Sequence, residues 1–124
     1  MKVWLSAPID GQKNYNKKEF EKMEQEIAEL GWEPINPLKV VGKDALKLGL
    51  SGNSLWLYCL IRDLEKLVEC DACYFHHTWR RSTGCQIERL VAEKFEKIIM
   101  EQRQVRVGKY ILAILERREN EKSA

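Results

Sequence analysis

The stretch 79–92, which reads W-R-R-S-T-G-C-Q-I-E-R-L-V-A, combines residue types that could bind an anion and act on it. It follows a short apolar run at 72–75, which we interpret as a buried strand, and it leads into apolar residues at helical spacing. Ser82 and Gly84 fall where strand would pass into helix, and the free N–H groups of a helix N-terminus favour an anion. Glu88 follows one helical turn later. We hypothesise a phosphate or sugar site with one carboxylate beside it. The apolar residues that predict this helix by their spacing are Ile87, Leu90, Val91 and Phe95.

The cysteines offer a second chemistry. Cys70-x-x-Cys73, followed by His76 and His77, could be half of a zinc site or a redox pair. A second C-x-x-C is absent from the sequence, and strand alternation would turn the two thiols to different faces. We therefore favour buried thiols that pack as small apolar groups, and we expect neither a metal nor a cofactor. The remaining cysteines are Cys59 and Cys85.

Three further side chains each allow two interpretations. Asp63, in a helix expected from Ser54 to Val68, either lies exposed and pairs with a neighbouring Lys or Arg, or points into a pocket at the strand ends. Periodicity alone favours the exposed position. Trp56 and Trp79 either pack against the core or stack on a base, and packing is the commoner role. Of the two tryptophans, Trp79 is the better stacking candidate because it belongs to the stretch described above.

Composition describes a single domain of ordinary solubility. The 124 residues are 44% hydrophobic and 32% charged, with a net charge of +2. This charge favours neither a nucleic acid nor a membrane as partner. No apolar run is long enough to cross a bilayer, and the N-terminus resembles a strand instead of a signal peptide. We expect a cytoplasmic protein, in the host cytoplasm if the chain is phage-encoded.

The elements that must position these residues alternate between strand and helix. We expect strands at 3–7, at 32–36, at 72–75 and at 97–101, and helices following each of the first three. This alternation predicts an α/β fold, a three-layer, doubly wound (flavodoxin- or Rossmann-like) parallel sheet of four to five strands. Ligands bind such sheets at the carboxyl ends of the strands. Residues 39–53 are interpreted as a long loop, either a lid or a plain connection.

Five motifs together resemble a known group of proteins. They are V-W-L-S-A-P-I-D-G at 3–11, I-N-P at 35–37, W-L-Y-C-L-I-R-D-L at 56–64, C-D-A at 70–72 and W-R-R-S-T-G-C-Q-I-E at 79–88. In this order and spacing they resemble a family of small phage and bacterial domains of unknown function. That family is similar in turn to the nucleoside 2-deoxyribosyltransferases and to the 2′-deoxynucleoside 5′-monophosphate N-glycosidases. The resemblance covers residues 2–101.

Residues 102–124 lie outside the resemblance, and we interpret them as a helical extension for assembly. Val105 and Val107 are expected in a short strand or edge before a helix from Gly108 to Arg118.

The resemblance implies retaining chemistry at a glycosidic carbon. Glu88 matches the glutamate that attacks C1′ of the deoxyribose, and Asp63 matches the aspartate that protonates or holds the departing base. Ser82 matches the serine that helps to bind a 5′-phosphate. Three positions differ from the enzymes, which carry tyrosine at Trp4, aspartate at Thr83 and, in the phosphate hydrolases, arginine at Asp10. The residues that we expect to bind substrate are Ser6, Pro8, Ile9, Asp10, Gly11, Asn36, Trp79, Arg81, Ser82 and Gly84.

Three functions follow as hypotheses. The first is an N-glycosidase or deoxyribosyltransferase acting on a deoxynucleoside or its 5′-monophosphate. The second is a nucleotide-binding protein without turnover, such as a phage-type sponge or a sensor for a nucleotide signal. The third is an assembly domain built on the final helix. In each case we expect a homodimer or a higher homo-oligomer, with a small-molecule nucleoside or nucleotide as the ligand of the first two.

Overall fold

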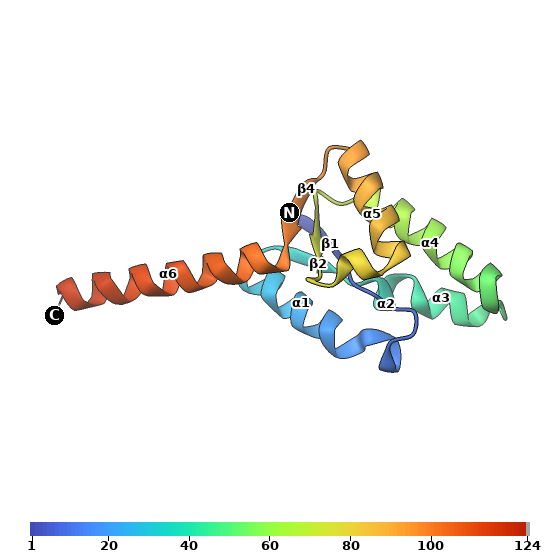
Figure 1. Ribbon diagram of the computed structural model, residues 1–124, viewed down its shortest axis with the longest axis horizontal. Coiled ribbons are helices and arrows are strands. Elements are labelled where there is room, and N and C mark those ends of the chain that lie inside the picture. Colours follow the sequence, from blue (N-terminus) through green and yellow to red (C-terminus); the bar gives the residue numbers. More distant parts are fainter. Residues whose placement is uncertain (124) are drawn as a thin grey trace.

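The sheet is parallel throughout and has four strands. The computed structural model describes residues 1–123, apart from the side chains at positions 43, 46 and 120–123, and position 124 lies outside the description. The strands are β1 (Lys2–Ser6), β2 (Glu33–Ile35), β3 (Ala72–Phe75) and β4 (Ile98–Glu101), and their order in the sheet is β2-β1-β3-β4. The predicted α/β fold with a parallel sheet is confirmed (Figure 1).

Helices cover both faces of this sheet, giving three layers. The helical elements are η1 (Lys13–Asn16), α1 (Lys17–Glu29), α2 (Pro37–Val40), α3 (Gly42–Lys47), α4 (Gly52–Val68), η2 (Trp79–Arg81), α5 (Thr83–Lys94) and α6 (Gln102–Ser123). One apolar cluster joins α1 to the sheet through Phe20, Met23 and Ile27. A second cluster joins α4 and α5 to the opposite face through Leu67 and Ala92. Because the central strands contact an apolar cluster on each face, their sequences are continuous apolar runs.

Strand β1 lies in the centre and divides its side chains between the two layers. Val3 and Leu5 belong to the cluster on the α1 side, whereas Trp4 belongs to the cluster under α4 and α5. Because side chains alternate along a strand, Ser6 faces the same way as Trp4. All four are at most 1% exposed. A hydroxyl buried this deeply needs a hydrogen-bond partner, which the site provides.

Two predictions about connecting segments are wrong. Residues 39–53 were expected to form a loop, but α2, α3 and the start of α4 occupy most of this segment. Asn36 begins α2, since its side-chain oxygen accepts a hydrogen bond from the N–H of Leu38 at 3.0 Å and Pro37 takes the first helical position. Val105 and Val107 were expected in a short strand or edge because they alternate with charged residues. They lie instead in α6, which begins directly after β4.

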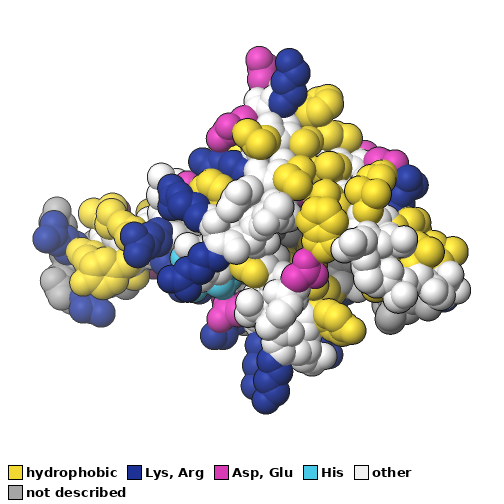
Figure 2. Space-filling model, turned by 45° about the vertical axis from the view of Figure 1, so that its right-hand side comes forward, with side chains coloured by type: hydrophobic (Ala, Val, Ile, Leu, Met, Phe, Trp, Pro, Cys, Tyr) yellow, Lys and Arg dark blue, Asp and Glu magenta, His cyan; other side chains and the backbone are white. Residues whose placement is uncertain are grey.

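Periodicity located helices correctly but assigned parts of their buried faces wrongly. Two members of the apolar series, Leu90 in α5 and Phe95 at its C-cap, are 66% and 58% exposed. The buried side chains are instead Cys85, Glu88 and Ala92. Leu57 in α4 is also apolar, yet it is 51% exposed. Apolar side chains therefore gather on the outer face of α4 and α5, as Figure 2 shows.

Helix α6 runs away from the body of the domain (Figure 1). Its first turn is attached by Gln102, which is 1% exposed and joins the backbone N–H of His77 to a carboxylate oxygen of Glu26. Arg106 and Lys109 then pair with Glu26 and Glu29 of α1. Within residues 1–123, no helix is both long enough and apolar enough to span a membrane.

Candidate functional site

The strand order changes direction between β1 and β3. From β1 the chain moves to β2 on one side, and then returns to β3 on the other side. The carboxyl ends of β1 and β3 lie together there, where the N–H of His76 donates to the carbonyl of Ser6 at 2.8 Å. Loops that leave neighbouring strands in opposite directions open a crevice, which is the usual ligand position in this fold class.

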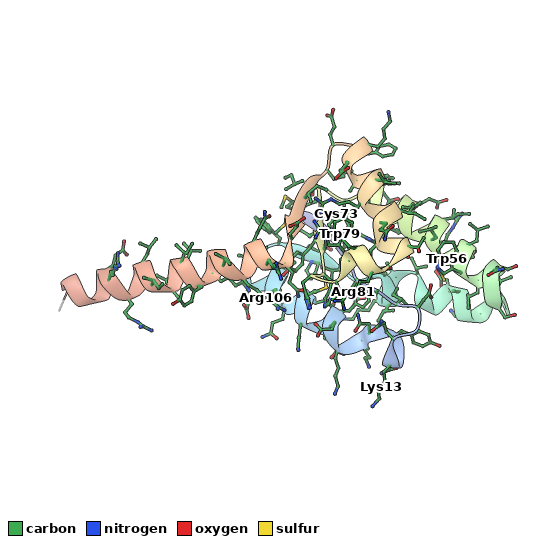
Figure 3. The ribbon with its side chains drawn as sticks, in the orientation of Figure 1. Lys13, Trp56, Cys73, Trp79, Arg81 and Arg106 are labelled. Carbon is green, nitrogen blue, oxygen red and sulfur yellow. The ribbon has the colours of Figure 1, made fainter. Side chains whose placement is uncertain are left out.

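A cavity of about 430 Å³ opens at this point. Its walls come from the loop after β1, from α4, and from the segment between β3 and α5. The lining residues are Pro8, Asp10, Gln12, Trp56, Thr78, Arg81, Ser82, Thr83 and Gly84. Figure 3 shows the position of Trp56 on α4 and of Arg81 in η2. The volume is within the range that holds a small molecule.

One wall of the cavity is the N-terminus of α5. Ser82 is its capping residue, and the serine Oγ accepts a hydrogen bond from the N–H of Cys85 at 3.2 Å. Thr83 and Gly84 form the first turn, where helical N–H groups have no partner within the helix. Arg81 adds a positive charge, whereas Asp10 adds a negative one to the same cavity. The wall therefore offers donors for an anion or for sugar hydroxyls, with Asp10 as an acceptor.

Glu88 projects from α5 toward the sheet and is 6% exposed. Ser6 Oγ donates to Glu88 Oε2 at 2.7 Å, and Trp4 Nε1 donates to Glu88 Oε1 at 3.3 Å. Burial raises the pKa of Glu88 to about 7, although the two hydrogen bonds act in the opposite direction. The carboxyl group is therefore held between two neutral donors from the central strand. Bulk solvent does not surround it.

Asp63 is also buried, which excludes the exposed position that periodicity alone favoured and leaves the other interpretation, an inward-pointing carboxyl group. The side chain is 8% exposed, and its Oδ1 has no hydrogen-bond partner among the described residues. Burial, and secondarily the charge of Glu88, raise the pKa of Asp63 to about 8. An unpartnered buried carboxyl oxygen is costly to keep, and such groups gather at functional sites. Asp63 and Glu88 together form a buried pair that favours holding one proton near neutral pH.

Cys85 links the carboxyl pair to the cavity wall, a role that the sequence did not indicate. It is 2% exposed, and the hydroxyls of Ser6 and Ser82 lie close enough to its thiol to act on the thiol pKa, which they lower. Burial, and then the nearby charge of Glu88, raise the pKa of Cys85 to about 11. The group is therefore a neutral thiol that fills the space between Glu88 and the N-terminus of α5.

The expected binding residues divide into those at the site and those that serve the fold. Pro8, Asp10, Arg81, Ser82 and Gly84 line the cavity, and Ser6 hydrogen-bonds to the carboxyl pair behind it. Other expected residues serve the fold, and they are Ile9, which packs on the core, Gly11, which takes a positive φ of 71°, and Asn36, which caps α2 and donates to Glu24. The cavity is also lined by Gln12 and Thr78, which the sequence did not single out, by Thr83, and by Trp56, the less favoured of the two stacking candidates.

Trp56 lines the cavity, whereas Trp79 packs beside it. The Trp79 ring lies 5.8 Å from Phe75 between ring centroids. The guanidinium groups of Arg80 and Arg89 lie 4.8 and 4.9 Å from its centroid. These contacts hold η2 against the sheet. Trp56 faces the cavity because it lies seven residues, or two helical turns, before the buried Asp63 and therefore on the same side of α4.

The Cys70–Cys73 pair consists of buried thiols, as favoured from the sequence. Both are at most 3% exposed, and burial raises their pKa values to about 11 and about 12. Thiols of this kind are largely protonated at neutral pH and bind metals poorly. Among the described residues there is no group of three or more His, Cys, Asp or Glu side chains that could hold a metal ion.

Comparison with known families gives a match over most of the chain. The model of a family described as "Domain of unknown function (DUF4406)" matches residues 1–101. This range contains all four strands, the cavity and both buried carboxyl groups, and it ends where α6 begins. No curated protein matches the chain.

Proposed function

Because the chain belongs to the DUF4406 family, whose description names no activity, we propose a function from the site itself: cleavage or transfer at the N-glycosidic bond of a deoxynucleoside or its 5′-monophosphate. The observation that carries the proposal is the pair of buried carboxyl groups, Glu88 and Asp63, beside a cavity at the switch in strand order. Two carboxyl groups in different protonation states are what glycosidic chemistry requires. The resemblance of the sequence motifs to the nucleoside 2-deoxyribosyltransferases supports the same choice.

In the proposed reaction Glu88 is the nucleophile. Its carboxylate attacks C1′ as the bond from C1′ to the base nitrogen breaks, and the bonding electrons leave with the base. Asp63, the group of higher pKa, is protonated when Glu88 is ionised and donates its proton to the departing base. Water or the N–H of a second base, which loses its proton to the now ionised Asp63, then displaces the carboxylate from C1′ and restores the configuration at that carbon. Ser6 and Trp4 orient the nucleophile.

The cavity supplies groups suited to the rest of a nucleotide. We propose that the α5 N-terminus with Ser82 and Arg81 binds a 5′-phosphate or the sugar hydroxyls. Trp56 offers an aromatic surface for a base. The carboxylate of Asp10 would repel the additional negative charge of a longer phosphate chain, so a monophosphate or an uncharged nucleoside suits this cavity better than a triphosphate.

The test is release of free base from the four common deoxynucleosides and their 5′-monophosphates, followed by liquid chromatography. We expect release by the wild-type chain and loss of at least a hundred-fold with Glu88→Gln, since the amide keeps the shape but is a poor nucleophile. Glu93→Gln, which changes an exposed carboxylate of the same helix, is the matched control and should leave the rate unchanged. Equal release by wild type and Glu88→Gln would refute the role of Glu88.

A second candidate function is nucleotide binding without turnover. Glu88 is 6% exposed and is not among the residues that line the cavity, so the free chain presents its hydroxyl, guanidinium and backbone groups more openly than its carboxyl pair. Calorimetric titration with the same nucleotides separates the two functions. Tight binding that survives Glu88→Gln, with no base released by the wild type, would favour a binding protein; release by the wild type alone would favour the enzyme.

A further inference from the structure

Helix α6 carries an apolar surface that no part of the described chain covers. Tyr110–Leu115 is a run of six apolar residues, in which Tyr110, Leu112 and Leu115 are 69%, 55% and 48% exposed. Figure 1 shows this part of the helix beyond the body of the domain, and Figure 2 shows its apolar side chains. A helix that is apolar on most sides is normally buried by a partner.

Gly108 marks one side of this helix for close approach. A glycine inside a helix costs roughly 0.5–1 kcal/mol relative to alanine. A Cβ added at Gly108 would meet no atom within 4 Å, so nothing in the described chain explains the glycine. Leu112 and Leu115 follow at i+4 and i+7, so the three residues form one stripe. A second helix lying over this stripe would approach most closely at Gly108.

The charges beside the stripe would pair with their opposites on a second copy of the helix if the two copies lay antiparallel. Lys109 and Glu116 are two turns apart on one edge of the stripe, and both are equally far from the midpoint between Leu112 and Ala113. Turning a copy of the helix end to end about this midpoint brings each lysine beside the other copy's glutamate. A parallel pair would instead place this edge against the opposite edge of the partner helix, so the lysine and the glutamate would not meet. Lys109 also binds Glu29 of α1 at 2.9 Å, and an ammonium group has three donors, so it can serve both carboxylates.

We propose that α6 is the docking surface for a second copy of this chain, with two α6 helices packed antiparallel around a twofold axis near Leu112. Gly108, Leu112 and Leu115 form the contact, and Lys109 pairs with the partner's Glu116 on each side of the axis. Such a contact is isologous and closes as a dimer. The proposal does not depend on the function of the cavity.

Charge exchange tests the antiparallel register. Sedimentation velocity of the full chain over a concentration series should give a dimer. Lys109→Glu should weaken it roughly ten-fold, because two attractive pairs become repulsive. Adding Glu116→Lys should restore the dimer, which a lysine serving Glu29 alone would not explain. Arg117→Glu is the control charge reversal and should leave the dimer intact. A chain that sediments as a monomer at every concentration, or a double exchange that fails to restore the dimer, overturns the proposal.

Two further variants test the stripe without relying on charge. Gly108→Ala should raise helix stability and yet weaken the dimer at least ten-fold, so misfolding cannot account for the loss. Leu112→Asp should give monomers, and Leu57→Asp on α4 should not, although both remove an exposed leucine. A dimer lost with Leu57→Asp but kept with Leu112→Asp would place the contact on α4 and overturn the role of α6.

Discussion

Replacing Asp63 by asparagine should make the protein less sensitive to high pH. The pKa of Asp63 rises from its ordinary 3.8 to about 8, mainly because the group is buried. Between these two values the unfolded chain has released this proton while the folded chain keeps it. The folded state then binds more protons than the unfolded state, so the free energy of unfolding falls as pH rises. Below about pH 4 the group is protonated in both states and the effect disappears.

The size of the effect follows from the pKa change. Each pKa unit corresponds to about 1.4 kcal/mol, so the rise at Asp63 sets an upper bound on the order of 5 kcal/mol. Water that enters from the neighbouring cavity when the carboxylate ionises reduces this cost, and we expect about 2–3 kcal/mol between pH 5 and pH 9. Asp63→Asn removes the ionisation and keeps the side-chain shape. The variant should therefore gain stability relative to wild type as pH rises.

The assay is urea unfolding of both proteins at a series of pH values from 5 to 9. The difference in free energy of unfolding, variant minus wild type, should grow by about 2–3 kcal/mol across this range. The lowered pKa of buried His76 acts in the opposite direction, but it contributes equally to both proteins and cancels in the difference. Glu65→Gln, at an exposed carboxylate of the same helix, should give a flat difference. Parallel curves for wild type and Asp63→Asn would refute the assignment of a buried, protonated carboxyl group.

Three shorter predictions concern side chains around the site. Ser6→Ala removes the donor to Glu88 Oε2, so it should raise the pKa of Glu88 in a carboxyl NMR titration and cost about 1–3 kcal/mol in urea unfolding. Ser82→Ala should cost about 1 kcal/mol because α5 loses its cap, and Ser82→Asp should recover most of it; equal losses would contradict the capping role. Gln102→Leu leaves the N–H of His77 unpaired and should cost about 1–3 kcal/mol, measured in the same way, whereas an unchanged midpoint would show that water replaces the amide.

The sequence predicted the sheet because its strands are short apolar runs separated by helix-length segments. Val3–Ala7 and residues 72–75 needed no tertiary information, since a strand buried on both faces is apolar throughout. It could not predict which side of α4 would be buried. Leu57 and Ile61 carry the apolar signal but are 51% and 42% exposed, whereas Asp63 is 8% exposed. Hydrophobic periodicity gives the direction of an apolar stripe and does not say whether anything packs against it.

For the candidate site, sequence spacing predicted where Glu88 lies along its helix, but the sequence did not predict which residues contact it. Glu88 falls one turn after Gly84 and therefore lies beside the α5 N-terminus, as its position in the helix requires. Its hydrogen bonds to Trp4 and Ser6 join residues more than 80 positions apart in the sequence. Such contacts depend on the strand order, which the sequence pattern leaves open. The place of Cys85 between Ser6 and Ser82 depends on the same packing.

The carboxyl group of Glu88 is held from the middle of the sheet, and the cavity wall comes mostly from loops. Trp4 and Ser6 belong to β1, which has a strand on each side, whereas Pro8–Gln12 and Thr78–Ser82 lie outside the strands. Surface loops accept insertions and substitutions far more readily than a central strand does. Under the proposed function, substitutions in these loops would change which molecule is accepted without disturbing the acidic centre. That separation makes the scaffold a good starting point for laboratory evolution toward new ligands.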